Sequence, residues 1–203
     1  MLCTLTDLKT RIGIDSADTA QDDLLTALIA GFTAAAEGYC GRALVLTAED
    51  VTEYYSGVAE FLCLRRYPVV EITSVKEAID WDFDSATALV ADSDYRLVGS
   101  GEKGILYRCY GKWSPVPDSI QVVYRGGFLS AEPGEGEPVE GEIAMPADLQ
   151  TEAINQCSFL YKRKDDLGLS GVSFQGGSFN KFADLDLLPT VRQTLDRYRR
   201  LVL

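Results

Sequence analysis

The sequence predicts an α+β fold, in which an N-terminal helical hairpin and a third helix pack with a small antiparallel β subdomain and a helical arm ends the chain. Two observations predict this class. Near both ends of the chain, apolar residues recur at steps of three and four, which is the spacing of an amphipathic helix. Between residues 49 and 128, short apolar runs alternate with polar residues and are separated by Gly, Pro, Asp and Ser, which is typical of strands.

The first two helices are predicted over residues 4–12 and 18–41. Thr4 or Thr6 can cap the first helix, and Gly13 can end it. The second helix has aspartates in or near its first turn, where the helix dipole favours negative charge. Because only a short turn joins the two helices, we expect them to pack as a hairpin.

The second helix carries a wide apolar face, which needs partners on much of its surface. Its small residues allow another helix to approach closely. We therefore expect this face to lie in helix packing, either within one subunit or between subunits. We call this expected packing surface the seam of the second helix. The residues assigned to it are Leu24, Leu28, Phe32, Ala35, Ala36 and Tyr39.

The strands are predicted from short runs of β-branched and aromatic residues. Their connections are short, which favours antiparallel pairing. The predicted strands cover residues 51–55, 60–64, 69–75, 95–98, 105–110 and 120–124.

An acidic segment, residues 130–142, follows the last strand. It reads SAEPGEGEPVEGE and contains five glutamates and no basic residue. Such a composition cannot form a core, so we expect a mobile surface loop that faces solvent or a DNA channel. Its glutamates are Glu132, Glu135, Glu137, Glu140 and Glu142.

A third helix is predicted over residues 146–164, which completes a core of residues 1–164. Residues 165–203 are predicted as a glycine-rich tether and a final helix that begins at Pro189. This helix is amphipathic and basic, and two interpretations remain open. In the first, the helix packs on its own domain. In the second, it docks into a groove of a partner protein, and the flexible tether favours this docking. The residues assigned to docking are Val191, Arg192, Leu195, Arg197, Tyr198, Arg199, Arg200 and Val202.

Composition excludes several classes of function. The net charge of −12 opposes binding to the outside of a nucleic-acid duplex and to an anionic membrane. The absence of histidine removes Ser-His-Asp and Cys-His nucleophile systems and all histidine metal sites. Five widely spaced cysteines without a C-x-x-C pair indicate reduced thiols in a cytosol-like compartment. We expect no signal peptide and no membrane-spanning segment.

Two motifs resemble ligand sites but lack the required context. The G-x-G-x-x-G run at residues 99–104 precedes a predicted strand rather than a helix, so a hairpin turn is favoured over a phosphate loop. The D-x-D-x-D run at residues 80–84 is followed by Ser85, where a calcium loop needs glycine, so a solvated acidic turn is favoured. The tryptophans and tyrosines could stack on bases, but no basic groove accompanies them. We assign no catalytic, cofactor-binding or metal-binding residue.

Four stretches together resemble the tailed-phage head–tail connector (adaptor) proteins. They are DDLLTALIAGFTAAAEGYCGRAL, RRYPVVEITSVKEA, IQVVYRGGF followed by MPADLQTEAI, and LPTVRQTLDRYRRLVL. They occur in the family's order and cover most of the chain. The acidic segment departs from the family's usual short connection, so its role does not transfer.

The resemblance implies a non-enzymatic virion protein, made in the host bacterial cytoplasm and located at the neck. It implies a homo-oligomeric ring that matches the twelve-fold symmetry of the portal. It also implies contacts with the portal protein and with a head-completion (stopper) or tail protein. DNA would pass through the channel during packaging and ejection without sequence-specific binding, and no cofactor or membrane is implied. Two alternatives remain: an acidic adaptor module that binds a basic partner without forming a ring, and a small cytosolic enzyme that uses Cys or Asp chemistry.

Overall fold

The computed structural model confirms the α+β class. In the residues it describes, four α-helices accompany two three-stranded sheets and a two-stranded hairpin. The chain divides into two compact units. The helical unit is Met1–Tyr39 with Pro146–Tyr198, and the β unit is Cys40–Met145 with Arg199–Leu203. The described residues are 1–132, 141–164, 171–173, 179–181 and 187–200.

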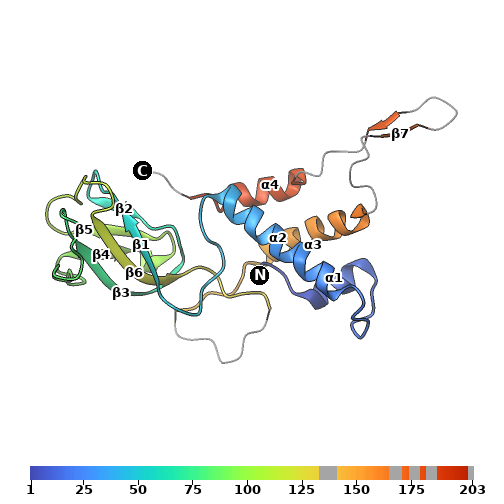
Figure 1. Ribbon diagram of the computed structural model, residues 1–203, viewed down its shortest axis with the longest axis horizontal. Helices are drawn as coiled ribbons and strands as arrows, with labels where there is room; N and C mark the ends of the chain where they lie inside the picture. Colours follow the sequence, from blue (N-terminus) through green and yellow to red (C-terminus); the bar gives the residue numbers. More distant parts are fainter. Residues whose placement is uncertain (133–140, 165–170, 174–178, 182–186, 201–203) are drawn as a thin grey trace. The chain divides into compact units, whose positions relative to one another are not determined.

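The helical unit contains α1 (Leu5–Ile12), α2 (Asp22–Cys40), α3 (Ala147–Lys162) and α4 (Pro189–Asp196) (Figure 1). Thr4 caps α1, because its side-chain oxygen accepts a hydrogen bond from the Asp7 N–H at 2.9 Å. Gly13 ends α1, as predicted, and adopts a left-handed conformation with φ of 79°. In the described residues, no helix is both long enough and apolar enough to cross a membrane.

Helix α2 begins at Asp22, later than the predicted start at residue 18. The preceding segment forms turns instead, because Asp15 accepts from the Ala17 N–H and Asp18 from the Ala20 N–H, each at 2.9 Å. Such local side-chain bonds offer the backbone an alternative to the helix. Lys9 of α1 forms an ion pair with Asp22 at the start of α2, at 2.5 Å.

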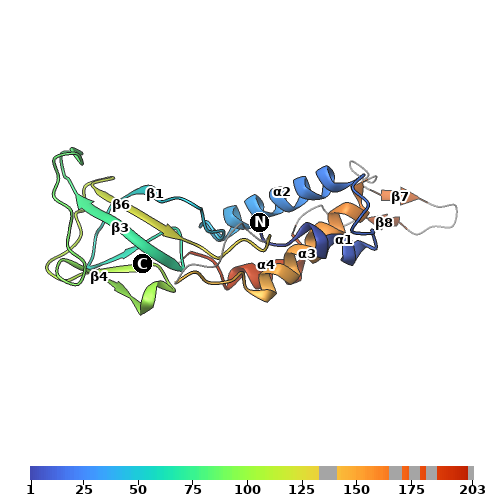
Figure 2. The ribbon, with the colours of Figure 1, turned by 90° about the horizontal axis from the view of Figure 1, so that it is seen from below.

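The described residues of the β unit form six strands in two sheets. Strand β6 (Ile120–Gly126) lies between β1 (Val51–Tyr55) and β3 (Val69–Glu77), as Figure 2 shows. In the second sheet, β5 (Ile105–Arg108) lies between β2 (Phe61–Cys63) and β4 (Tyr95–Val98). All of these pairs are antiparallel, as expected from the short connections.

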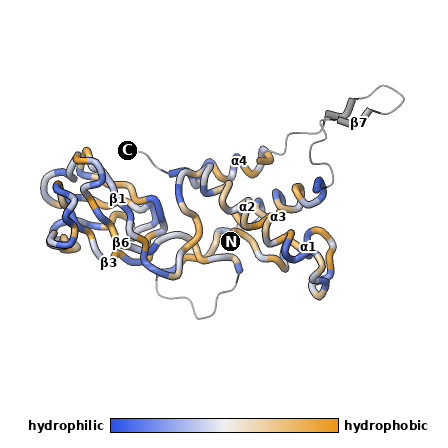
Figure 3. The backbone as a smooth tube through the Cα atoms, viewed as in Figure 1, coloured by the Kyte–Doolittle hydropathy of each residue, from blue (hydrophilic) through white to orange (hydrophobic). Residues whose placement is uncertain are grey.

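The two sheets share one hydrophobic core. Buried residues alternate along β6, where Ile120, Val122 and Tyr124 face inward. Hydrophobic residues recur along β3 and β6 (Figure 3). Leu62 of β2 and Leu106 of β5 join the same cluster from the second sheet. The β unit is therefore held by inter-sheet packing rather than by either sheet alone.

The segment predicted as a tether contains regular structure in its described part. Strands β7 (Gly171–Ser173) and β8 (Phe179–Lys181) pair as an antiparallel hairpin. The final helix is shorter than predicted. It ends at Asp196, where Arg197 and Tyr198 close turns onto Thr194 and Leu195.

Candidate functional site

The C-terminal helix packs within its own unit through its apolar side. Val191 and Leu195 are 0% and 1% exposed. Its basic side remains at the surface, where Arg192, Arg197 and Arg199 are exposed and Tyr198 and Arg200 are half-buried. Val202, the last residue assigned to docking, lies outside the described residues. Of the residues predicted to dock, Val191 and Leu195 are thus buried, whereas the arginines stay at the surface.

Polar contacts fix α4 antiparallel to α3. The Leu188 N–H donates to Gln156 Oε1 at 2.9 Å, and the Thr190 hydroxyl donates to Glu152 at 3.1 Å. At the other end, Asp148 near the start of α3 accepts from the Tyr198 hydroxyl at 2.7 Å and pairs with Arg197 at 3.0 Å. The order of the contacts along α4 is the reverse of their order along α3, so the two helices are antiparallel. Because contacts occur at both ends of α4, the helix is held along its length.

Beyond α4, the last described residues belong to the β unit. The Arg200 N–H donates to the Cys40 carbonyl at 2.8 Å, and its guanidinium donates to the Cys63 carbonyl at 3.1 Å. The Tyr67 hydroxyl donates to the Arg199 carbonyl at 3.3 Å. These backbone contacts explain why the helix does not continue to the end of the chain as predicted.

Arg42 is a buried guanidinium beside this C-terminal segment, and the sequence reading did not single it out. It is 5% exposed, stacks over the Tyr67 ring, and donates to the Tyr67 carbonyl. The Phe128 ring lies 5.7 Å from the guanidinium carbon. Burial lowers the pKa of Arg42 from its ordinary value. The only sequence signal was its position directly after the helix-ending Gly41, which has φ of 64°.

The predicted seam of α2 divides into two faces. Phe32 and Ala36 are buried, Leu28 and Tyr39 are half-buried, and Leu24 and Ala35 are exposed. The buried face continues through Leu25, Ile29 and Cys40, which the sequence reading did not place in the seam. The exposed face is made of small or apolar residues: Leu24, Ala27, Ala30, Gly31, Ala34, Ala35 and Gly38.

The acidic segment is only partly described. Glu132 and Glu142 are half-buried. Glu135, Glu137 and Glu140 lie outside the described residues. The predicted channel role therefore stays a prediction.

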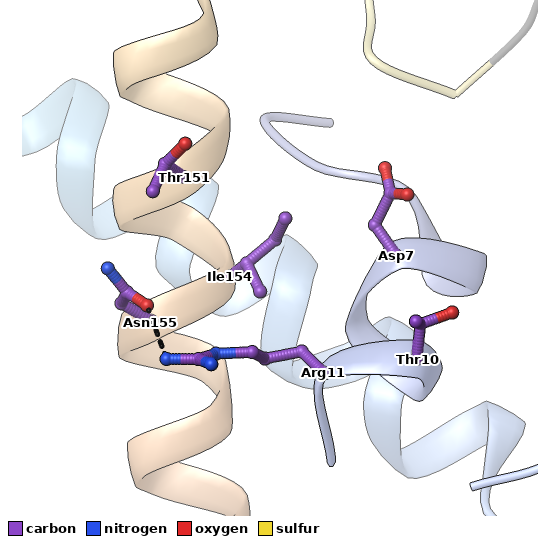
Figure 4. A pocket seen from close by; sticks show the side chains of 6 residues that line it. All are labelled: Asp7, Thr10, Arg11, Thr151, Ile154 and Asn155. Atoms are coloured by element: carbon purple, nitrogen blue, oxygen red, sulfur yellow. Dashed lines mark hydrogen bonds between the residues drawn. The ribbon is translucent and has the colours of Figure 1, made fainter. Parts of the chain in front are cut away.

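A groove of about 540 Å³ lies between α1 and α3. Figure 4 shows Arg11 of α1 reaching toward Asn155 of α3, whose side-chain oxygen it meets at 3.4 Å. The remaining lining residues are Asp7, Thr10, Thr151 and Ile154. The hydroxyls of Thr10 and Thr151 donate to the carbonyls of Thr6 and Ala147, at 2.9 and 2.8 Å, so in this structure they bond to their own helices. The sequence reading did not identify this groove, because it depends on how α1 packs against α3.

The glycine motif that resembled a phosphate loop lies in a turn. The glycine run at 99–104 forms the turn between the antiparallel strands β4 and β5, as expected. In the described residues, no group of three or more His, Cys, Asp or Glu is arranged to hold a metal ion. The hydroxyls of Tyr55 and Tyr124 both contact Glu53, and burial raises the pKa of each. Both therefore remain protonated donors in a buried polar network.

Comparison with known proteins gives a partial family match. Residues 3–97, which make up less than half of the chain, match the family described as Phage gp6-like head-tail connector protein. No curated protein sequence matches the chain.

Solved structures share its fold along almost the whole chain. One is the neck of an empty GTA particle computed with C6 symmetry, at 16% identity and a TM-score of 0.60. A second is the virion of a native gene transfer agent (GTA) particle, at 17% identity and a TM-score of 0.59. A third is the neck of a native GTA particle computed with C12 symmetry, at 16% identity and a TM-score of 0.56. Each match covers 98% of this chain and 89% of the other chain. At these identities, the likeness shows a common fold.

Proposed function

We propose that the protein is a ring-forming subunit of the virion neck, which connects the portal to a head-completion or tail protein while DNA passes through its channel. The observation that carries the proposal is the family match over residues 3–97, because the family is one of head–tail connectors. The fold agrees, since neck structures with C6 and C12 symmetry contain a chain of the same fold. A ring of twelve copies is the proposed assembly.

The exposed face of α2 is the proposed contact between neighbouring subunits. Its small residues let a second helix approach closely, and exposed apolar residues such as Leu24, at 39% exposure, gain from being covered. Phe32 and Ala36 cannot take part, because they are already buried within the subunit. A ring requires a contact between two different surfaces of the same chain, so this face meets another surface of the neighbour.

The C-terminal segment is the proposed contact with the portal. Since Val191 and Leu195 pack inside the helical unit, the contact rests on the exposed Arg192, Arg197 and Arg199. A planar guanidinium pairs with carboxylates in a bidentate manner, which suits an acidic rim on the partner. Val202 remains part of the proposal from the sequence alone.

The acidic segment at residues 130–142 is the proposed wall of the DNA path. Its five glutamates repel phosphates, so DNA would move past without adhering. This part of the proposal rests on the sequence composition and on the net charge of −12.

Native mass spectrometry of the purified chain, alone and mixed with its portal protein, tests the assembly. The expected result is a closed oligomer of twelve copies, formed alone or on the portal. A chain that stays monomeric with portal present would contradict the proposal and favour an acidic adaptor module. Charge-removing variants of Arg192 and Arg199 should weaken portal binding without changing the circular dichroism spectrum.

A further inference from the structure

The loop between β3 and β4 exposes apolar and acidic side chains in alternation. We propose that this aromatic–acidic loop, Ile79–Asp84, is a docking surface for an arginine-rich segment of a partner protein. The proposal goes beyond ring formation and portal contact, because it concerns a separate surface on the β unit. It rests on exposure, on local rigidity and on charge.

Two large apolar side chains of the loop face solvent. Ile79 is 68% exposed and Trp81 is 58% exposed. Phe83 extends the apolar surface to β1, because its ring lies 5.4 Å from the ring of Tyr54, which is 42% exposed. Exposed apolar groups that adjoin one another mark interaction sites, and tryptophan is enriched among the residues that dominate binding energy.

The exposed position of Trp81 is fixed by hydrogen bonds. Its indole N–H donates to the Pro117 carbonyl at 2.9 Å, and its backbone N–H donates to the Ala78 carbonyl at 3.2 Å. Its backbone is left-handed, with φ of 62°. Lys76 secures the next residues by donating to the Phe83 carbonyl at 2.7 Å. A ring held in place loses little conformational entropy on binding.

The loop is also strongly acidic. Asp80, Asp82 and Asp84 are all exposed, and in the described residues none of them forms an ion pair. Hydrogen bonds from Ser85 lower the pKa of Asp82, so this carboxylate is charged at neutral pH. Lys76 acts on Asp82 electrostatically and lowers its pKa further. The surface therefore presents more negative than positive charge to a partner.

These features together select an arginine-rich protein segment. A guanidinium pairs with carboxylates and also stacks on the face of an indole, so arginine matches both parts of the loop better than lysine. Nucleic acid is repelled by the same carboxylates. A divalent cation is disfavoured, because the described residues include no carboxylate group arranged to hold a metal.

The test measures binding of a fluorescein-labelled synthetic peptide of alternating arginine and leucine to the full chain, by fluorescence anisotropy. The variant Asp80→Asn/Asp82→Asn/Asp84→Asn should bind about tenfold more weakly, as expected from the loss of several charge pairs. The matched control Glu49→Gln/Glu60→Gln/Glu102→Gln removes the same charge from exposed positions elsewhere in the β unit. We expect it to change binding less than about twofold.

A second readout uses the tryptophans. The chain has two, and Trp113 is 1% exposed, so collisional quenching of the emission by acrylamide reports mainly on Trp81. The arginine peptide should protect this emission from quenching, and a lysine–leucine peptide of equal charge should protect it less. The variant Asp80→Asn/Asp84→Asn keeps the Asp82–Ser85 hydrogen bonds and checks that weaker binding is not caused by a disturbed loop.

Several results would overturn the proposal. Equal weakening by both charge-removing triples would show that only net charge matters. Unchanged Trp81 quenching, or equal protection by the lysine peptide, would remove the aromatic part of the surface. Self-association that depends on the three aspartates, without peptide binding, would instead make the loop a contact between copies of the chain. None of these results depends on whether the protein forms a ring.

Discussion

The Arg42 guanidinium carbon lies 3.3 Å from the centre of the Tyr67 ring. The two residues come from different stretches that carry the family resemblance: Arg42 follows the glycine that ends α2, and Tyr67 precedes β3. Tyr67 in turn donates to the Arg199 carbonyl. The stacked pair therefore joins the start of the β unit to the last described residues of the chain.

This relationship predicts that Arg42→Lys destabilises the protein although it keeps the charge. A lysine loses the planar stacking and the bond to the Tyr67 carbonyl, which we expect to cost about 1–3 kcal/mol. Urea denaturation measures the loss. Tyr67→Phe is the matched control, because it keeps the ring and removes only the hydroxyl, so its effect should be about 1 kcal/mol or less. Equal stability of Arg42→Lys and wild type would contradict the role of stacking.

Substitutions at two neighbouring alanines of α2 should distinguish an effect on folding from an effect on assembly. Ala36 is 0% exposed, so Ala36→Glu buries a charge and should unfold the helical unit. Ala35 is exposed, so Ala35→Glu should leave the fold intact and block assembly if this face contacts a neighbour. Circular dichroism checks folding, and light scattering checks assembly. Normal oligomers from Ala35→Glu would exclude this face as the subunit contact.

The two sides of α4 should respond differently to substitution. Leu195→Ala removes a buried side chain, so we expect a loss of about 2–5 kcal/mol and a lower melting temperature. Arg192→Ala on the exposed side should change stability by less than about 0.5 kcal/mol. Thermal unfolding measured by circular dichroism distinguishes the two. A small effect of Leu195→Ala would mean that α4 is not required for the helical core.

Stability should fall as the pH rises above about 9. A hydrogen bond with Cys3, together with burial, raises the pKa of the Cys157 thiol well above its ordinary value of 9.0. The folded protein keeps this proton while the unfolded chain loses it, so the stabilisation is complete below pH 9 and decreases at higher pH. Each such group contributes about 1.4 kcal/mol per pH unit. Tyr55, whose pKa burial also raises, adds to the loss above pH 10.

Urea unfolding at pH 8, 9 and 10 measures this dependence. Cys157→Ala should reduce the steepness of the loss between pH 9 and 10 by about 1.4 kcal/mol per pH unit, whatever its effect at neutral pH. Cys109→Ala, at a half-buried position of the β unit, is the control. An unchanged slope in Cys157→Ala would show that this thiol does not titrate differently in the two states.

Local sequence patterns were sufficient to predict the elements but not all of their packing. The period of two predicted all six strands of the β unit, because these strands are half-buried and their turns contain Gly and Pro. On α2, two apolar stripes run side by side, and periodicity cannot decide whether Leu24 or Leu25 faces the core. That choice depends on where the other helices lie. The burial of Arg42 is likewise a tertiary effect that no spacing indicates.

The candidate interaction residues were only partly predictable for the same reason. The final helix was recognised as amphipathic and basic, but its sequence fits packing on α3 as well as docking on a partner. The contacts of Gln156 and Asp148 with Leu188 and Tyr198 show that the final helix packs on α3 in the described structure. For the aromatic–acidic loop, the sequence predicts a solvated turn, because the sequence shows its charge but not the exposure of Trp81.

The short stretch from Leu195 to Arg200 contributes to both units. Leu195 lies in the helical core, and Arg200 binds the backbone of Cys40 and Cys63 in the β unit. An insertion or deletion between these two residues would therefore disturb the contacts of one unit or the other.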